Sequence, residues 1–181
     1  MSNQVWWEPV KYKTQPGDEI KGRQSHSTVC YKGKIYMFGG CFAFNKKRHA
    51  RENTNQLVEF DPDAKYMKIV QINGVSVGLR KDHTAVVYKN SMVVLGGTGE
   101  GGMMADDMLA YNFEDREWVK IKYNGCQVNL FSQGAACTVV PRKTKDMFLT
   151  RKVSFYKSDW ITERPNSRRN LLLWRKTGAV Q

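Results

Sequence analysis

Two pairs of arginine and histidine side chains recur in this chain with the same internal spacing. Arg23 and His26 form the first pair, and Arg80 and His83 form the second. Such a pair can bind an anion or serve in acid–base catalysis, because arginine carries a fixed charge and histidine titrates near neutral pH. Recurrence at equivalent positions favours a structural role instead, strongly for the histidines. For the arginines, their place in a loop before a strand keeps ligand contact open.

The other residues with ligand-binding chemistry form no recognisable site. The third imidazole, His49, lies far from the repeated pairs, and three scattered histidines lack the spacing of metal ligands. The stretch GGTGEGG at residues 96–102 looks like a phosphate cradle, but no Lys-Ser/Thr ending and no helix pattern follow it. We therefore expect no metal site, no cofactor and no catalytic residue.

Composition places the chain among globular proteins of one-domain size. Its 181 residues are 41% hydrophobic, and no apolar run is long enough for a membrane span. The four cysteines show no Cys-x-x-Cys pair and the N-terminus does not read as a signal peptide, so we expect free thiols in the cytoplasm or nucleus. Of the net charge of +12, most lies in residues 142–181, which hold 11 Lys and Arg against 3 Asp and Glu.

The segment around each Arg-His pair is one half of a longer repeat. GRQSHSTVCYKGKIYMFGG occupies residues 22–40, and GLRKDHTAVVYKNSMVVLGG occupies residues 78–97. Both end on a glycine doublet, where we expect the chain to be too crowded for a Cβ atom. Further on, we match Asn55 with Asp107 and Tyr66 with Trp118. Each copy then contains four short β-strand patterns, which predicts antiparallel sheets repeated as propeller blades.

The motif as a whole resembles the kelch repeat over about residues 22–150. That repeat has Arg-x-x-His, a glycine doublet closing the second strand, and an aromatic residue before a Trp that opens the fourth. The resemblance implies an all-β fold of four-stranded antiparallel blades from an incomplete propeller. It assigns structural roles to the motif residues of both copies, with Phe60 matching Tyr111 and Tyr66 replacing the usual Trp. These residues are His26, Gly39, Gly40, Tyr66, His83, Gly96, Gly97, Tyr111 and Trp118.

The ends of the chain depart from the repeat pattern. We divide the chain into an N-terminal strand of a neighbouring blade at 1–21, repeats at 22–77 and 78–131, a partial repeat at 132–150, and a basic tail at 151–181. The partial repeat has Arg151-Lys152 where glycines are expected. The tail is interpreted as a truncation or frame artefact, a disordered tail, or a functional element such as a short amphipathic helix. So few blades cannot close a ring, so we expect a fragment or self-association that covers the open blade faces.

The resemblance implies a non-enzymatic scaffold or adaptor that binds another protein. In such blades the long connections, which include residues 41–54 and 98–106, lie at one end, where we expect a partner with an acidic segment to bind. Alternatives are a fragment of a copper oxidase-like or isomerase-like enzyme, and nucleic-acid binding through the tail. We expect no membrane association. The predicted partner-binding residues are Arg23, Phe44, Lys46, Lys47, Arg48, Arg51, Arg80, Met103 and Met104.

Overall fold

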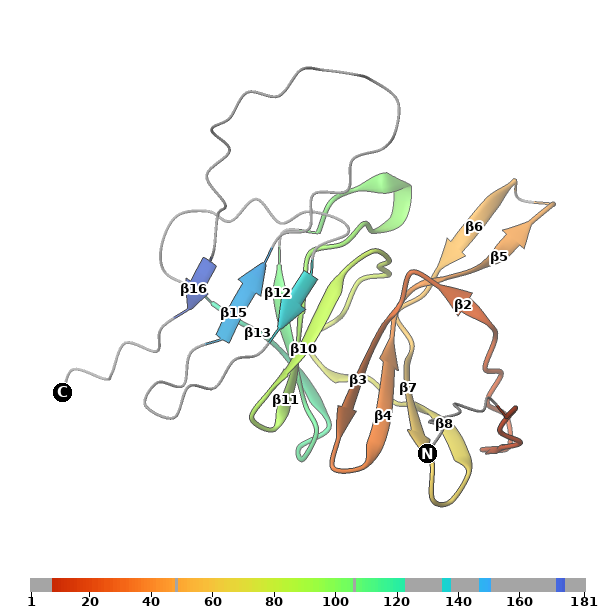
Figure 1. The fold of residues 1–181 in the computed structure, drawn as a ribbon. Helices are drawn as coiled ribbons and strands as arrows, with labels where there is room; N and C mark the ends of the chain where they lie inside the picture. The colour runs from red at the N-terminus through yellow and green to blue at the C-terminus, as the bar shows by residue number, and fades with distance from the viewer. Residues whose placement is uncertain are drawn as a thin grey trace, which may run out of the picture.

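The described part of the chain is built almost entirely of β-strands and turns. Its only helical segment is one 3-10 turn, η1 (Glu100–Gly102), and no helix in this part is long and apolar enough to cross a bilayer. The computed structural model describes residues 8–47, 49–105 and 107–122, and the backbone of 135–137, 147–150 and 172–174. An all-β fold is therefore confirmed (Figure 1).

The first repeat forms one sheet of four antiparallel strands with a short fifth strand at its edge. The strand order is β1-β8-β7-β4-β3, and β1 pairs in parallel with β8. The strands are β1 (Lys13–Thr14), β3 (Ser27–Tyr31), β4 (Lys34–Phe38), β7 (Leu57–Asp61) and β8 (Tyr66–Val70). The four antiparallel strands lie where the sequence pattern predicts them.

The second repeat has the same plan. The strand order is β10-β11-β12-β13-β9, with the short β9 again parallel to the outer strand. The strands are β9 (Asn73–Gly74), β10 (Thr84–Tyr88), β11 (Ser91–Leu95), β12 (Met108–Asn112) and β13 (Glu117–Lys120). In both repeats the segment that precedes the first long strand therefore runs along the outer edge of its own sheet.

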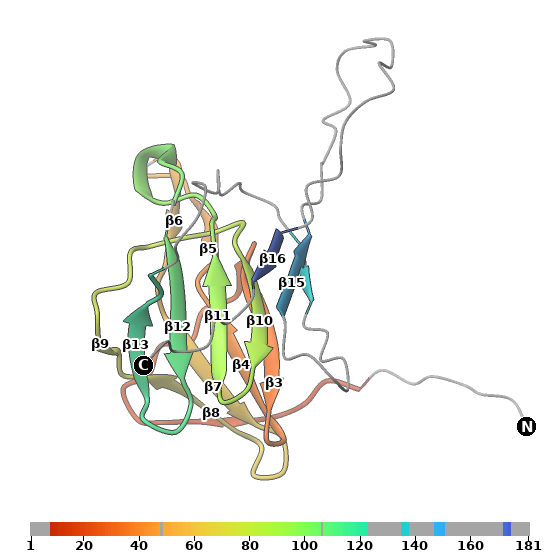
Figure 2. The ribbon, with the colours of Figure 1, turned by 90° about the vertical axis from the view of Figure 1, so that its left-hand side faces the viewer.

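A third sheet follows the first two. It consists of β14 (Ala135–Cys137), β15 (Met147–Thr150) and β16 (Leu172–Trp174), joined in antiparallel order. Strand β10 lies beside both β3 and β14, so the first strands of three successive sheets are neighbours, as around a propeller axis (Figure 2). The helix considered for the tail is wrong at residues 172–174, which form a strand. The boundaries of the partial repeat and the tail stay predictions.

A small fourth sheet projects from the first repeat and was not foreseen. The connection at 41–54, which the sequence predicts as a loop, is mostly a β-hairpin of β5 (Cys41–Asn45) and β6 (Ala50–Asn53). The hairpin is extended on its other side by β2 (Arg23–Gln24), which pairs with β5. Figure 1 shows this hairpin standing out from the end of the blade.

The main core lies between the first two sheets. Phe38 of the first repeat packs against Trp118 of the second, with ring centroids 4.8 Å apart, and both side chains are fully buried. At the opposite end of this interface, Tyr31 stacks on Phe113 at 4.1 Å. Burial of apolar and aromatic area across this interface stabilises the pair of repeats as one unit.

The strand register corrects the alignment of the two repeats by one residue. Phe60 pairs with Met67 across the sheet of the first repeat, as Tyr111 pairs with Trp118 in the second. Met67, and not Tyr66, therefore occupies the position of Trp118, so the sequence assignment of Tyr66 is wrong. The error arose because both residues are large and adjacent, while only the pairing reveals which face each one occupies.

The N-terminal segment lies along the first repeat in the described residues. Residues 8–12 belong to no strand, and β1 follows them on β8. The Asp18 carboxylate accepts a hydrogen bond of 2.6 Å from the backbone N–H of Ile69. The prediction that residues 1–21 complete a neighbouring blade stays a prediction.

Candidate functional site

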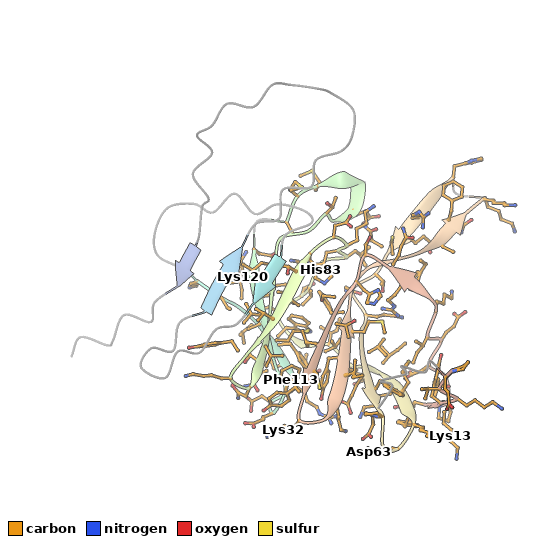
Figure 3. All side chains as sticks on the ribbon, in the orientation of Figure 1. Lys13, Lys32, Asp63, His83, Phe113 and Lys120 are labelled. Atoms are coloured by element: carbon orange, nitrogen blue, oxygen red, sulfur yellow. The ribbon has the colours of Figure 1, made fainter. Side chains whose placement is uncertain are left out.

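The second Arg-His pair lies at the contact between the two repeats. His83 precedes β10, and its Nε2 atom lies 2.8 Å from Oγ of Ser27, on the first strand of the other repeat. Its ring also meets the ring of Phe38 edge-on at 5.2 Å. Figure 3 places His83 near one end of the interface and Phe113 and Lys32 toward the other. His83 therefore joins two blades rather than lining an open pocket.

The glycine doublets are required by close packing at the same place. A Cβ atom on Gly39 would lie 2.6 Å from the carbonyl oxygen of Arg80 and 2.8 Å from Cε1 of His83. A Cβ atom on Gly97 would meet the carbonyl oxygen of Lys81 at 2.6 Å. Both glycines also have positive φ, which side chains disfavour. The predicted crowding is present, and at Gly39 it comes from the neighbouring repeat.

The two arginines make equivalent contacts with partners of different charge. Arg80 is 3% exposed, and its guanidinium forms an ion pair with the Asp107 carboxylate at 2.8 Å. Arg23 is half-buried and donates a hydrogen bond of 2.7 Å to the side-chain oxygen of Gln56. Each arginine also donates to the first glycine carbonyl of its own doublet. Gln56, and not Asn55, is therefore the counterpart of Asp107.

Burial lowers the pKa of both histidines. The pKa of His83 falls to about 3, mainly because burial disfavours its charged form and secondly because Arg80 is close. The pKa of His26 is also lowered, by burial and then by Arg23. Burial likewise lowers the pKa of Arg23. A neutral His83 suits the hydrogen bond to Ser27 between the repeats, and a lowered pKa in both histidines disfavours a role in anion binding.

The long connections at the end of the blades form an exposed surface. Phe44 on the β5–β6 hairpin is 52% exposed, and Met103, after η1, is 74% exposed. The two segments are joined at their base, because the Asn53 side-chain amide donates a hydrogen bond of 3.0 Å to the Gly99 carbonyl. We call residues 41–54 and 98–105 the loop end.

Most of the predicted partner-binding residues lie exposed at the loop end. They are Phe44, Lys46, Lys47, Arg51, Met103 and Met104. Arg23 lies at the base of the hairpin, with its guanidinium 5.4 Å from the ring centre of Phe42. Arg80 is buried in its ion pair and offers no contact surface, so its assignment to partner binding is corrected to the structural alternative. Arg48 lies outside the described residues.

Phe42 is a feature of this end that the residue patterns did not single out as a site. Two cations lie near its ring, with Nζ of Lys21 at 5.8 Å and the guanidinium carbon of Arg23 at 5.4 Å from the ring centre. The alternation of Phe42 and Phe44 before a short polar turn was the available signal for a strand at this place. The contact of Lys21 with Phe42 depends on the pairing of β2 with β5, and no sequence pattern predicts that pairing.

The described residues hold no group of three or more metal-ligating side chains. Cys41 is buried and Cys30 is exposed, and the two are free thiols. Cys126 lies outside the described residues, as does the side chain of Cys137.

Comparison with known proteins connects this architecture to one family. Residues 2–156 match the KLHDC2/KLHL20/DRC7 Kelch-repeats domain. The leucine-zipper-like transcriptional regulator 1 homolog of Drosophila melanogaster is 30% identical over 63% of this chain and 12% of its own length. Kelch-like protein 15 of Mus musculus is 24% identical over 54% of the chain and 16% of its own length. Putative protein tag-53 of Caenorhabditis elegans is 31% identical over 56% and 8%. The chain thus spans a small part of each relative.

Proposed function

The chain belongs to the kelch-repeat family, and from this premise we propose that it is a non-enzymatic protein-interaction module whose loop end binds a partner protein. The observation that carries the proposal is the exposure of Phe44, Met103 and Met104 on two segments that are joined at their base. Aromatic and methionine side chains are enriched in protein interfaces, and a rigid scaffold that presents long connections is the usual arrangement of a binding surface. Kelch repeats typically serve this purpose.

We further propose that the bound segment of the partner is acidic. Lys46, Lys47 and Arg51 are exposed on the hairpin. Arg23 has only neutral acceptors among the described residues, unlike Arg80, whose charge is balanced by Asp107. Complementary charge at the rim of an interface raises the rate of association and helps to select the partner.

We also propose that the protein acts in the cytoplasm or nucleus. Two free thiols, one of them exposed, suit a reducing environment such as the cytoplasm or nucleus. A scaffold or adaptor role there requires the loop end to stay accessible while the sheets hold its shape.

Site-specific photo-crosslinking tests the position of the interface. A photoreactive phenylalanine analogue is placed at Phe44, at Met103, or at the control position Val10, which is 55% exposed and lies outside the loop end. We expect the first two variants to crosslink to the same protein in cell extract. The Val10 variant should give no crosslink to that protein. Equal crosslinking from Val10, or different proteins captured from Phe44 and Met103, would contradict the proposal.

Charge reversal tests the acidic partner once it is captured. Lys46→Glu with Lys47→Glu should weaken its binding at least about tenfold at low salt. The matched control reverses Lys11 and Lys13, which are exposed near the opposite end of the first sheet, as Figure 3 shows for Lys13. Equal losses of affinity in the two double variants would show that the positive charge of the hairpin does not specifically contribute to partner binding.

A further inference from the structure

The β5–β6 hairpin belongs to a small sheet whose outer strand is open on one side. The strand order is β2-β5-β6, and in the described part of the chain no strand pairs with the other side of β6. The edge strand at the far side, β2, is two residues long, whereas β6 has four. An unpaired edge presents backbone N–H and C=O groups to which another strand can be added. We call this side of β6 the open edge.

The register shows which backbone groups of β6 point to the open edge. Successive residues of a strand direct their N–H and C=O groups alternately to its two sides. The N–H of Thr54, directly after β6, donates to the Gly40 carbonyl at 2.9 Å and so points across the base of the hairpin toward β5. By alternation, Arg51 and Asn53 direct their N–H and C=O groups to the open edge.

The side chains of β6 give its two faces opposite charge. Arg51 pairs with Phe44 of β5, so these two exposed side chains share one face. Glu52 lies on the other face, where its carboxylate accepts a hydrogen bond of 3.3 Å from the Asn45 side chain. A residue placed beside Arg51 at the open edge therefore lies next to a cation, with an aromatic ring one strand further away.

We propose that an acidic segment of the partner protein binds as an extended strand, antiparallel to β6 at its open edge. This inference rests on the proposed function of the loop end and specifies how that surface holds its partner. The antiparallel direction continues the order of the sheet, in which β5 is antiparallel to both of its neighbours. The partner residue opposite Arg51 then directs its N–H and C=O groups to β6, and its acidic side chain forms a cross-strand ion pair.

The charge of the hairpin favours an acidic strand over a second copy of this chain. Lys46 and Lys47 are exposed at the turn, and Arg51 is exposed on β6 itself. Like charges opposite each other destabilise a strand pair, and charged side chains on an edge strand oppose pairing between identical chains. Two copies joined through β6 would bring two cationic hairpins together, whereas an acidic strand neutralises this charge.

The added strand lies on the side of the hairpin where the other part of the loop end is found. Figures 1 and 2 both show η1 on the β6 side of the hairpin, and the Asn53 side chain is hydrogen-bonded to Gly99, just before η1. The segment that carries Met103, which is 74% exposed, is therefore on the same side as the open edge. This position accounts for the crosslinks that we expect from both Phe44 and Met103.

Binding of designed peptides to the full chain tests the proposal. The probe is a fluorescein-labelled nonapeptide of alternating Thr and Glu that begins and ends with Thr, and fluorescence anisotropy should show saturable binding. Two isomers carry two backbone N-methyl groups each, on central Glu residues in one and on central Thr residues in the other. Methylation at Glu removes the N–H groups that pair with β6, whereas the Thr N–H groups point away from it.

We expect the Glu-methylated isomer to bind at least about tenfold more weakly than the Thr-methylated isomer, because it lacks hydrogen bonds of the strand pair. The two isomers have the same charge, so attraction between charges alone would bind them equally. Equal affinities, the reverse order, or no binding of the unmethylated peptide would overturn the proposal.

Hydrogen exchange measured by NMR tests the position of the added strand. In the complex with the unmethylated peptide, the amides of Arg51 and Asn53 should exchange at least about tenfold more slowly than in the free chain. Amides of residues 8–12, which belong to no strand, are the control and should keep their rates. Unchanged exchange at Arg51 and Asn53 would overturn the proposal. Slowing in the free chain that grows with protein concentration would identify a second copy as the occupant and would also overturn it.

A charge swap tests the ion pair at Arg51. The readout is the ratio of affinities for the Thr-Glu nonapeptide and for a nonapeptide of alternating Thr and Lys. Arg51→Glu should lower this ratio at least about tenfold, because the residue opposite position 51 then meets a carboxylate. The matched control Lys13→Glu, at an exposed position outside the loop end, should leave the ratio unchanged. Equal ratios in the two variants would contradict the assigned register.

These results separate the binding mode from the proposed function. If Phe44 and Met103 capture one partner while the peptides fail these tests, the loop end binds a protein without using the open edge of β6. If neither position captures a partner, the proposed function is wrong and this inference fails with it.

Discussion

The first and second repeats contain the same motif in different surroundings. In the second repeat, Arg80 is ion-paired and His83 is bound to the repeat before it. In the first repeat, Arg23 meets a neutral glutamine and His26 has no such neighbour among the described residues. The histidine therefore gains its hydrogen bond where one repeat follows another, whereas the two arginines differ because Asp107 stands in the second repeat where Gln56 stands in the first.

The repeated motif and the loop end have different roles, because the motif residues of the second repeat are buried and the loop end is exposed. Arg80 and His83 are buried, and their side chains make contacts inside the protein and not with a partner. The exposed residues that can meet a partner belong to connections that differ between the repeats, a hairpin in one and a loop with a 3-10 turn in the other. Residues that recur in both repeats therefore belong to the scaffold, and segments that differ between the repeats form the surface that can bind a partner.

The largest expected contrast is between Trp118 and its counterpart Met67. Trp118→Ala should lower the free energy of unfolding by about 3–5 kcal/mol, because the side chain is fully buried between the repeats. Met67→Ala should cost about 1 kcal/mol, since Met67 is half-buried on the face of the first sheet that points away from the second repeat. Urea unfolding of both variants measures the difference, and equal losses of stability would show that Trp118 and Met67 are equally buried in the folded protein.

The arginine partners should differ next. Asp107→Ala leaves the buried Arg80 guanidinium without its counter-charge and should cost about 3 kcal/mol. Gln56→Ala removes a neutral hydrogen bond from the half-buried Arg23 and should cost about 1 kcal/mol. Thermal unfolding at matched pH compares the two. A larger loss at Gln56 would mean that Arg23, and not Arg80, is the arginine that holds its repeat together.

Two glycines with nearly the same φ isolate the effect of crowding. Gly39→Ala should cost about 2 kcal/mol or more, because a positive φ of 64° is combined with a collision with the next repeat. Gly101→Ala, with φ of 65° and open space around it, should cost only the backbone term of about 1 kcal/mol. If denaturant unfolding gives the two variants the same loss, the doublet is explained by backbone conformation alone.

The last expected contrast is the acid sensitivity due to His83. Its pKa is 6.5 when unperturbed and about 3 in the fold, so below pH 6.5 the unfolded chain binds a proton that the folded chain excludes. Stability from this group is complete above pH 6.5 and falls by about 1.4 kcal/mol per unit as the pH drops toward 3. The His83→Gln variant should therefore lose less stability than the parent between pH 6 and pH 4.5. Parallel pH profiles would show that His83 is not buried in its neutral form.

The strands and the structural role of the motif could be predicted from the sequence. Alternating β-branched residues and turn residues at regular intervals placed the four strands of each repeat, because the period of side-chain burial is a local property. The recurrence of Arg-x-x-His and of the glycine doublet predicted structural roles for the histidines and glycines, and His83 and Gly39 make contacts of that kind between the repeats. Arg80 was instead predicted to bind a partner, and its buried ion pair corrects that assignment.

The features that depend on contact between segments could not be predicted. The match of Tyr66 with Trp118 was wrong by one residue, since cross-strand pairing sets the register and sequence similarity does not. The connection at 41–54 was predicted as a loop, although the alternation of Phe42 and Phe44 was a signal for β5. Its pairing with β2 could not be predicted, because β2 is a pair of residues without a strand pattern of its own. The different charge balance of Arg23 and Arg80 became visible only when Gln56 and Asp107 were found beside them.

The central claim is that the first two repeats are held together by packing of one sheet on the other. A double-mutant cycle on Phe38 and Trp118 tests it most directly. The two rings lie 4.8 Å apart on different repeats. Phe38→Leu, Trp118→Phe and the double variant are compared by urea unfolding. The account predicts a coupling free energy of about 1 kcal/mol between the two sites. Additive losses, with no coupling beyond error, would contradict it.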